Sequence, residues 1–229
     1  MASNAKPWIY FHVGLGKVAS TYLQYRFFPK LQGIRYIQRT QYRRAPQLIR
    51  KEQATRYLVS REFDRQLPDE VAWFSQCFRN VRPILLLRRH DAWIASQYRR
   101  YLKNGGRATM EAFLDLEKDQ GRWQLEEVRF MRYIQALEEA FDFPPLVLFH
   151  EDFKANPQAF FRYLAKEMDV TYDPHSIDLQ PFHASYTEKQ LRYMRKYGSR
   201  LFRKGRSLPR QPVARWLKRR SEMLLSYTL

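Results

Sequence analysis

A short segment near the N-terminus combines glycines, one lysine and two hydroxyl residues in an order that suits anion binding. It reads Gly-Leu-Gly-Lys-Val-Ala-Ser-Thr at residues 14–21, between an apolar run at residues 8–13 and a helical pattern at residues 22–28. Backbone N–H groups in the first turn of a helix lack partners within the helix, and the helix dipole adds partial positive charge there. Lys17 adds a mobile full charge. The segment therefore predicts a site for a phosphate group.

The spacing of this segment differs from that of the Walker loop of ATP- and GTP-binding proteins, G-x-x-x-x-G-K-[ST]. The first glycine of that pattern would fall at Phe11, and Val18 stands where the Walker loop has its magnesium-binding hydroxyl. The hydroxyl residues come later, at Ser20 and Thr21, three and four positions after Lys17. Taken alone, the segment is equally consistent with a plain strand-to-helix turn that carries a solvated lysine.

A second junction between a strand and a helix carries an arginine and a serine. The apolar run at residues 84–87 follows Pro83 and is typical of a buried parallel strand, and a helical pattern begins at Ala92. Arg88 follows the run directly, and Ser96 lies eight residues further on, within the helical pattern. In isolation, either residue is explained by an ordinary solvated strand end or by helix packing.

Taken together in this order, the two junctions resemble those of the PAPS-dependent sulfotransferases, where PAPS is 3′-phosphoadenosine-5′-phosphosulfate. The K-x-x-[ST]-T arrangement that starts at Lys17 resembles their 5′-phosphosulfate loop, and the spacing of Arg88 and Ser96 resembles their 3′-phosphate site. His90 stands where the family usually has proline. The resemblance covers roughly residues 8–169, about two-thirds of the chain, and indicates a compact member of bacterial type.

A weaker match lies at residues 146–157, which read as a strand, an acidic turn and a helix start. Asn156 is the expected N-cap and Pro157 the first helical residue. Glu151 and Asp152 are expected to fix the turn rather than to catalyse.

The resemblance implies a sulfotransferase that moves a sulfuryl group from PAPS to a hydroxyl or amine of a carbohydrate, glycolipid or small-molecule acceptor, with no metal. Such a transfer needs in-line positioning, neutralisation of charge on the leaving phosphate, and a base for the acceptor proton. Lys17 is implied for the neutralisation, while Tyr22 either stacks on adenine or faces the core. The implied cofactor-binding residues are Gly14, Gly16, Lys17, Val18, Ala19, Ser20, Thr21, Tyr22, Arg88 and Ser96, with Arg203 and Lys204 from a late R-K-G element.

The base is assigned by position. Glu62 comes just after the apolar run at residues 57–60, where the family often has a catalytic histidine or glutamate, so the resemblance implies that Glu62 is the catalytic base. The alternative is a surface glutamate paired with Arg61 or Arg65. The competing candidates for the base are the histidines, His12, His90, His150, His175 and His183. His12 is expected to be a core or sheet residue.

The order of patterns predicts an α/β fold. Buried strands are expected at residues 8–13, 57–60, 84–87 and 146–149. Helices between them, including one amphipathic helix over residues 125–137, predict a parallel β-sheet flanked by helices. The resemblance implies that this is the P-loop-like sulfotransferase fold. Ligands in such sheets bind beyond the carboxyl ends of the strands, so one pocket is expected to collect Lys17, Glu62 and Arg88.

The length and charge of the chain indicate its domain organisation and the kind of partner it binds. We expect one domain over residues 1–229, with a core at about 8–170 and a basic, mainly helical C-terminal extension at about 171–229. The net charge is +18, and residues 189–220 hold 13 basic side chains and no acidic one. Such an excess favours an anionic partner, either an acidic glycan or lipid acceptor or a peripheral contact with an anionic membrane. Nucleic acid is disfavoured as a partner, because it leaves the ordered spacing of Lys17, Arg88 and Ser96 unexplained.

The amino-acid composition excludes several classes of protein. A hydrophobic fraction of 45% excludes a disordered chain, and the single cysteine, Cys77, expected to be at least half-buried, excludes a disulfide framework. No apolar run approaches the length of a membrane span, and the N-terminus lacks the apolar core of a signal peptide. We therefore expect a cytoplasmic enzyme, a removed membrane anchor being the alternative. Two other functions stay open: a magnesium-dependent kinase-like enzyme, and a non-catalytic nucleic-acid or membrane binder that uses the basic C-terminal third.

Overall fold

The computed structural model describes residues 6–180 and 196. Among these, residues 6–93 and 126–180 belong to one compact unit, and residues 94–125 belong to a second. The first unit contains the sheet, and the expectation of a single domain stays a prediction.

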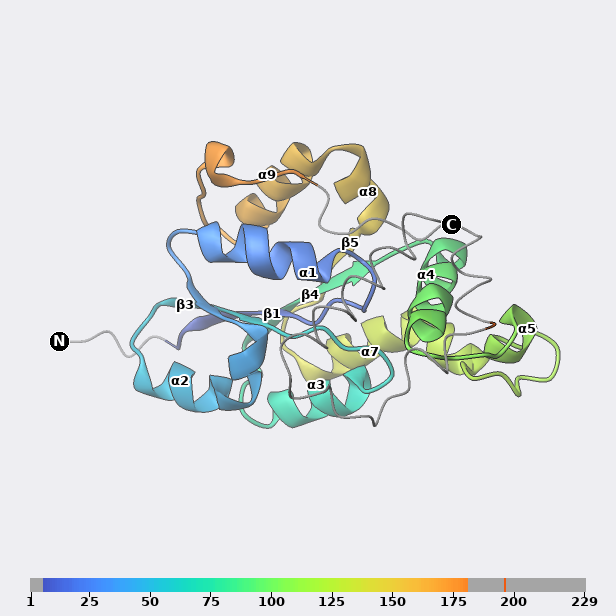
Figure 1. The fold of residues 1–229 in the computed structure, drawn as a ribbon. Helices are drawn as coiled ribbons and strands as arrows, with labels where there is room; N and C mark the ends of the chain where they lie inside the picture. The colour runs from blue at the N-terminus through green and yellow to red at the C-terminus, as the bar shows by residue number, and fades with distance from the viewer. Residues whose placement is uncertain (1–5, 181–195, 197–229) are drawn as a thin grey trace, which may run out of the picture. The chain divides into compact units, whose positions relative to one another are not determined.

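The sheet of the first unit is entirely parallel (Figure 1). Its strands are β1 (Trp8–His12), β2 (Arg35–Ile37), β3 (Arg56–Ser60), β4 (Val81–Leu87) and β5 (Leu146–Phe149), in the order β2-β3-β1-β4-β5. In the register, His12 lies opposite Ser60 on one side and Ile84 on the other. The carboxyl ends of β3, β1 and β4 therefore lie side by side at one edge.

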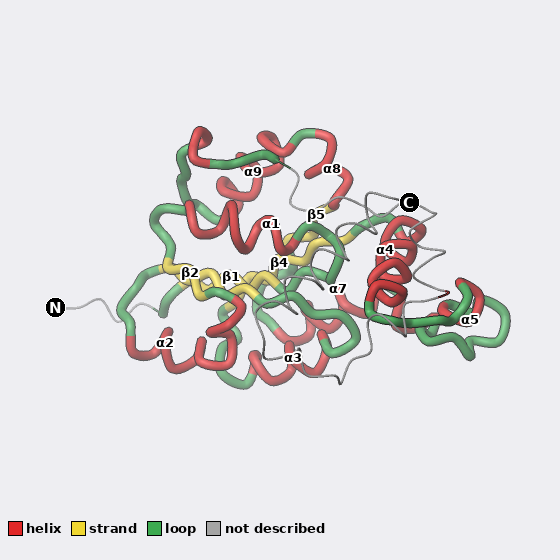
Figure 2. The backbone as a smooth tube through the Cα atoms, viewed as in Figure 1, coloured by secondary structure: helices red, strands yellow, loops and turns green. Residues whose placement is uncertain are grey.

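Helices cover both faces of this sheet (Figure 2). One face carries α1 (Ser20–Tyr22), α8 (His150–Ala155) and α9 (Pro157–Glu167), and the other carries α2 (Ala45–Lys51), α3 (Leu67–Ser75) and α7 (Phe130–Ala140). The remaining α-helices are α4 (His90–Lys103), α5 (Met110–Phe113) and α6 (Leu125–Val128). Shorter 3₁₀ or π segments are η1 (Leu23–Phe27), η2 (Phe28–Lys30), η3 (Arg39–Arg44) and η4 (Pro174–Ser176).

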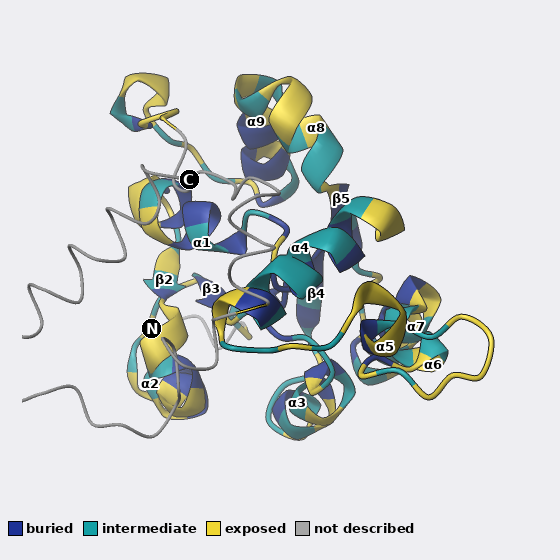
Figure 3. Cartoon of the chain, turned by 45° about the vertical axis from the view of Figure 1, so that its right-hand side comes forward, coloured by how far each residue is buried: buried dark blue, intermediate teal, exposed yellow. Residues whose placement is uncertain are grey.

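Aromatic side chains fill the core on both faces of the sheet. Successive side chains of a strand point to opposite sides, so each strand contributes to both faces. On the α3 side, the ring of Phe11 lies 4.4 Å from that of Phe74 and 6.1 Å from that of Phe63. On the other side, Phe27 stacks on Phe161 of α9, with ring centroids 4.4 Å apart. Figure 3 shows the buried residues gathered on the strands and on the helix sides that face them.

The sequence missed two features of the first unit. Strand β2 is three residues long and only Ile37 is buried in it, so no apolar run marks it. The single helix expected over residues 125–137 was wrong, because Arg129 is extended and separates α6 from α7. The break lets the Val128 carbonyl lie 3.1 Å from His90 Nε2 and lets Phe130 stack on the His90 ring, with centroids 3.9 Å apart.

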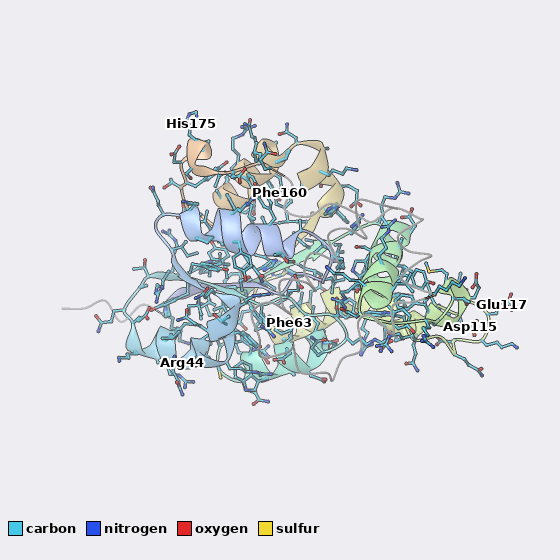
Figure 4. The ribbon with its side chains drawn as sticks, in the orientation of Figure 1. Arg44, Phe63, Asp115, Glu117, Phe160 and His175 are labelled. Carbon is cyan, nitrogen blue, oxygen red and sulfur yellow. The ribbon has the colours of Figure 1, made fainter. Side chains whose placement is uncertain are left out.

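The second unit, as far as it is described, is built around the end of α4. A loop follows at residues 104–109, and Gly106 lies so close to the Tyr101 ring that a Cβ there would clash at 2.3 Å. The Asp115 carboxylate accepts from the backbone N–H groups of Glu117 and Lys118, both at 3.0 Å, which fixes an exposed acidic turn (Figure 4).

In the described part of the chain, no helix combines the length and apolar character that crossing a membrane requires. Residues 6–180 and 196 also hold no cluster of three or more side chains able to ligate a metal.

Phe11 tests the aromatic core. It is fully buried, so Phe11→Ala should lower the free energy of unfolding by about 3–5 kcal/mol, measured by urea unfolding. Leu116→Ala is the control, since Leu116 is 71% exposed and should change stability by less than about 0.5 kcal/mol. Similar losses in the two variants would contradict this account of the core.

Candidate functional site

The glycine-bearing segment lies at the carboxyl end of β1, where it first continues the sheet. Val13 N–H donates to the Ile84 carbonyl at 3.0 Å, and Leu15 N–H donates to the Leu86 carbonyl at 3.3 Å. On the other side, Phe63 N–H donates to the Val13 carbonyl at 3.2 Å. The first residues of the segment are thus held by the chain of β4 and by the chain that follows β3.

Beyond Leu15 the backbone turns into the left-handed region. Lys17 and Ala19 both have φ of 72°, which is uncommon for residues with a Cβ and costs on the order of 1–3 kcal/mol each. Alternating left-handed residues turn successive N–H groups towards one side and form a concavity for anions. In the described part of the chain, the backbone N–H groups of residues 18–21 donate no hydrogen bond. This stretch, the amide cradle, is therefore available to phosphate oxygens.

Three side chains hold the backbone at Gly16 and Lys17, directly before the cradle. Asp64 Oδ1 accepts from Gly16 N–H at 3.0 Å, and the buried indole of Trp93 donates to the Gly16 carbonyl at 2.9 Å. Arg88 Nη1 donates to the Lys17 carbonyl at 3.2 Å. The structure therefore brings Arg88 to the same loop as Lys17, as the sequence predicted.

Gly14 is required by close packing beneath the cradle. A Cβ at this position would lie 2.3 Å from Ser20 Oγ and 2.8 Å from His12 Nε2. Ser20 is itself buried, and its hydroxyl donates to the Leu15 carbonyl at 3.2 Å. In this conformation the Ser20 hydroxyl thus closes the loop, whereas Thr21 is partly exposed.

Two further predicted cofactor-binding residues are buried. Val18 is fully buried. The ring of Tyr22 stacks on Phe161, with centroids 5.9 Å apart, and its hydroxyl donates to the Asp178 carbonyl at 2.5 Å. Of the two roles that the sequence left open for Tyr22, the structure favours the core residue.

His12 is a core residue, as expected. Its Nδ1 lies 2.8 Å from Ser60 Oγ, which also accepts from Gln24 Nε2 at 3.1 Å. Its Nε2 has no hydrogen-bond partner among the described residues. Full burial lowers the pKa of His12 to about 3, so its ring is neutral at physiological pH. This buried network lies directly under the amide cradle.

Glu62 lies two residues beyond β3 and is half-buried. Because β3 is the neighbour of β1, its end is about 5 Å from that of β1 in the hydrogen-bonding direction. Arg65, one of the two cations expected to pair with Glu62, makes an ion pair with Glu127 at 3.1 Å. Glu62 and Lys17 thus follow adjacent strands.

The competing histidines have other surroundings. His150 follows β5, which is three strands from β3, and burial lowers its pKa, as does the positive charge of Arg88. His90 is the first residue of α4, and its ring packs on that of Phe130. His175 is exposed in η4 (Figure 4), and His183 lies outside the described residues.

The weaker match at residues 146–157 also has a structural role. Glu151 Oε1 accepts from Arg89 N–H at 3.2 Å and so ties α8 to the end of β4. Residues 150–155 form helix α8 rather than a turn, because the acidic residues occupy its first turn, where they favour a helix. Asn156 caps α9 by accepting from Ala159 N–H at 3.0 Å, with Pro157 at the first helical position, as predicted.

No family model matches this sequence, and no curated protein matches it. Among solved structures, the chain is similar to a sulfotransferase from Alicyclobacillus acidocaldarius, with a TM-score of 0.57 and 14% identity. The match covers 86% of this chain and 92% of that one. The fold is that of a sulfotransferase. This confirms the predicted α/β fold with a parallel sheet flanked by helices.

Part of the site expected for a sulfotransferase stays a prediction. Ser96 lies in the portion of α4 that belongs to the second unit, so its action together with Arg88 is untested. Arg203 and Lys204 lie outside the described residues. Sequence reasoning missed Asp64 and Trp93, because their contacts with Gly16 depend on tertiary structure; the only local signal was that Asp64 follows Glu62 closely.

His12 predicts a pH dependence of stability. Its folded pKa of about 3 lies below the usual 6.5, so between these values only the unfolded chain binds the proton. Stability should be fully present above pH 6.5 and should fall by about 2 kcal/mol from pH 7 to pH 5 through this group.

Urea unfolding at the two pH values checks this, with His12→Asn expected to lack that part of the slope. His175→Asn is the matched control and should keep it, because His175 is exposed. An unchanged slope in His12→Asn would contradict the assignment.

Proposed function

We propose that this protein is a PAPS-dependent sulfotransferase that transfers a sulfuryl group to a hydroxyl or amine of an acceptor. The observation that carries the proposal is the amide cradle between Lys17 and Arg88 at the carboxyl edge of β1 and β4. Likeness of fold to a sulfotransferase supports it. The acceptor class proposed is a carbohydrate, glycolipid or small hydroxylated molecule, reached in the cytoplasm or at a membrane surface.

The donor chemistry of the cradle fits a phosphosulfate. Consecutive backbone N–H groups and an exposed lysine bind phosphate oxygens without needing a metal. Bound PAPS would supply the sulfuryl group and a phosphate leaving group. The N–H groups of residues 18–21 would hold the 5′-phosphate, and Arg88 would hold the 3′-phosphate.

Two residues would carry the transfer itself. Lys17 would neutralise the charge that builds on the bridging oxygen as its bond to sulfur breaks. Glu62 would accept the acceptor's proton as the new oxygen–sulfur bond forms. The position of Glu62 on the strand next to β1 supports this division of roles, whereas His150 lies on the far side of β4.

The kinase-like alternative is weakened by Val18. This fully buried side chain occupies the position where a Walker loop has its magnesium-binding hydroxyl. A magnesium-dependent phosphoryl transfer would need another ligand there.

Lys17→Ala tests the cofactor assignment. Calorimetry should detect metal-free binding of PAP, the desulfonated product, to the wild type, and binding should weaken at least tenfold in Lys17→Ala, because a charge-assisted contact is lost. ATP with magnesium should bind far more weakly. Lys30→Ala is the control, since Lys30 is exposed in η2. Absence of PAP binding by folded wild type would overturn the proposal.

Glu62→Gln tests the base. The variant should bind PAP as the wild type does but should lose roughly 10²–10⁴-fold in transfer rate, measured as PAP formation with any acceptor that supports turnover. Full activity in Glu62→Gln would move the role of base to another residue.

A further inference from the structure

Besides Lys17 and Arg88, two more cations lie at the carboxyl ends of the strands. They follow β3 and β2, on the opposite side of β1 from Arg88. Arg61 follows β3 directly, and Arg39 begins η3 two residues beyond β2. Arg61 Nη1 donates to the Arg39 carbonyl at 3.4 Å, so residues that follow adjacent strands meet there. Both arginines are exposed.

Arg39 and Arg61 differ from several nearby arginines, which form ion pairs with carboxylates. Arg35 pairs with Glu52, Arg43 pairs with Glu70, and Arg56 pairs with Asp169. Within residues 6–180, neither Arg39 nor Arg61 takes part in an ion pair. Because both guanidinium groups are exposed, an external anion can reach them.

An aromatic ring lies beside the pair. The Arg39 guanidinium lies over the ring of Tyr25, 5.4 Å from its centroid, and Tyr25 is 50% exposed. Tyr25 belongs to η1, which follows the amide cradle in the chain. The surface therefore combines two planar guanidinium groups with a partly exposed aromatic face.

Two acidic residues lie near these arginines, Glu70 and Glu62. Glu70, which approaches from α3, is engaged by Arg43 and by the Tyr42 hydroxyl. Glu62 directly follows Arg61. Arg61 therefore adjoins the proposed base in the chain.

We infer that Arg61, Arg39 and Tyr25 bind a carboxylated saccharide as the acceptor. We call these three residues the acceptor subsite. Guanidinium groups bind carboxylates in a planar, two-bond geometry, and an aromatic face offers apolar surface to the C–H face of a sugar ring. The inference rests on the proposed function, because Arg61 adjoins Glu62 in the chain and follows β3, on the opposite side of β1 from the strand that Arg88 follows.

The test uses a defined probe. Calorimetry would measure binding of an unsulfated oligosaccharide of alternating glucuronate and N-acetylglucosamine, and of a neutral N-acetylglucosamine oligomer of equal length. Each would be titrated with and without saturating PAP. The acidic saccharide should bind the wild type at least tenfold more tightly than the neutral one.

Three variants locate the site. Arg61→Gln and Arg39→Gln should each weaken binding of the acidic saccharide by about tenfold and leave binding of the neutral one and of PAP unchanged. Arg44→Gln is the matched control, because Arg44 is an exposed arginine at the other end of the same segment (Figure 4). An equal loss in Arg44→Gln would mean general attraction to a basic surface and would overturn the inference.

The two hypotheses fail differently. If the wild type binds PAP but not the acidic saccharide, or binds both saccharides equally, the acceptor subsite is wrong and the proposed function stands. If the saccharide binds through Arg61 and Arg39 while PAP does not bind, the proposed function fails and the subsite stands.

Discussion

The left-handed backbone at Lys17 and Ala19 is the constraint on which the site depends. It turns the N–H groups of residues 18–21 out of the hydrogen-bond pattern of the sheet and the helix. Two such residues cost on the order of 1–3 kcal/mol each. Hydrogen bonds between the loop and the side chains of Asp64, Trp93 and Arg88, each worth roughly 1 kcal/mol, offset that cost. The cradle thus persists because several elements hold it at once.

Packing below the loop adds a second restraint. Gly14 has no room for a Cβ, since Ser20 Oγ and His12 Nε2 occupy that space. His12 is in turn joined to Ser60, the last residue of β3, at 2.8 Å. Because Arg61 and Glu62 follow Ser60 directly, the same buried network positions both the phosphate loop and the proposed acceptor side. Changes at His12 should therefore affect two halves of the edge together.

The fold and the main loop could be predicted from sequence because their signals are local. Apolar runs marked four of the five strands, and the spacing after Lys17 marked the loop. Strand β2 was missed because only Ile37 is buried in it, and the helix break at Arg129 was missed because amphipathic spacing continues across it. Asp64 and Trp93 were missed since only the folded chain brings them to Gly16.

The central claim is that the N–H groups of residues 18–21 are the phosphate donors. The most direct measurement is a titration of ¹⁵N-labelled protein with PAP, followed by amide chemical shifts in NMR spectra. The account predicts that the largest downfield shifts fall on these amides, with smaller changes at Arg61 and Glu62. Shifts confined to other parts of the chain, with residues 18–21 unchanged at saturating PAP, would contradict it.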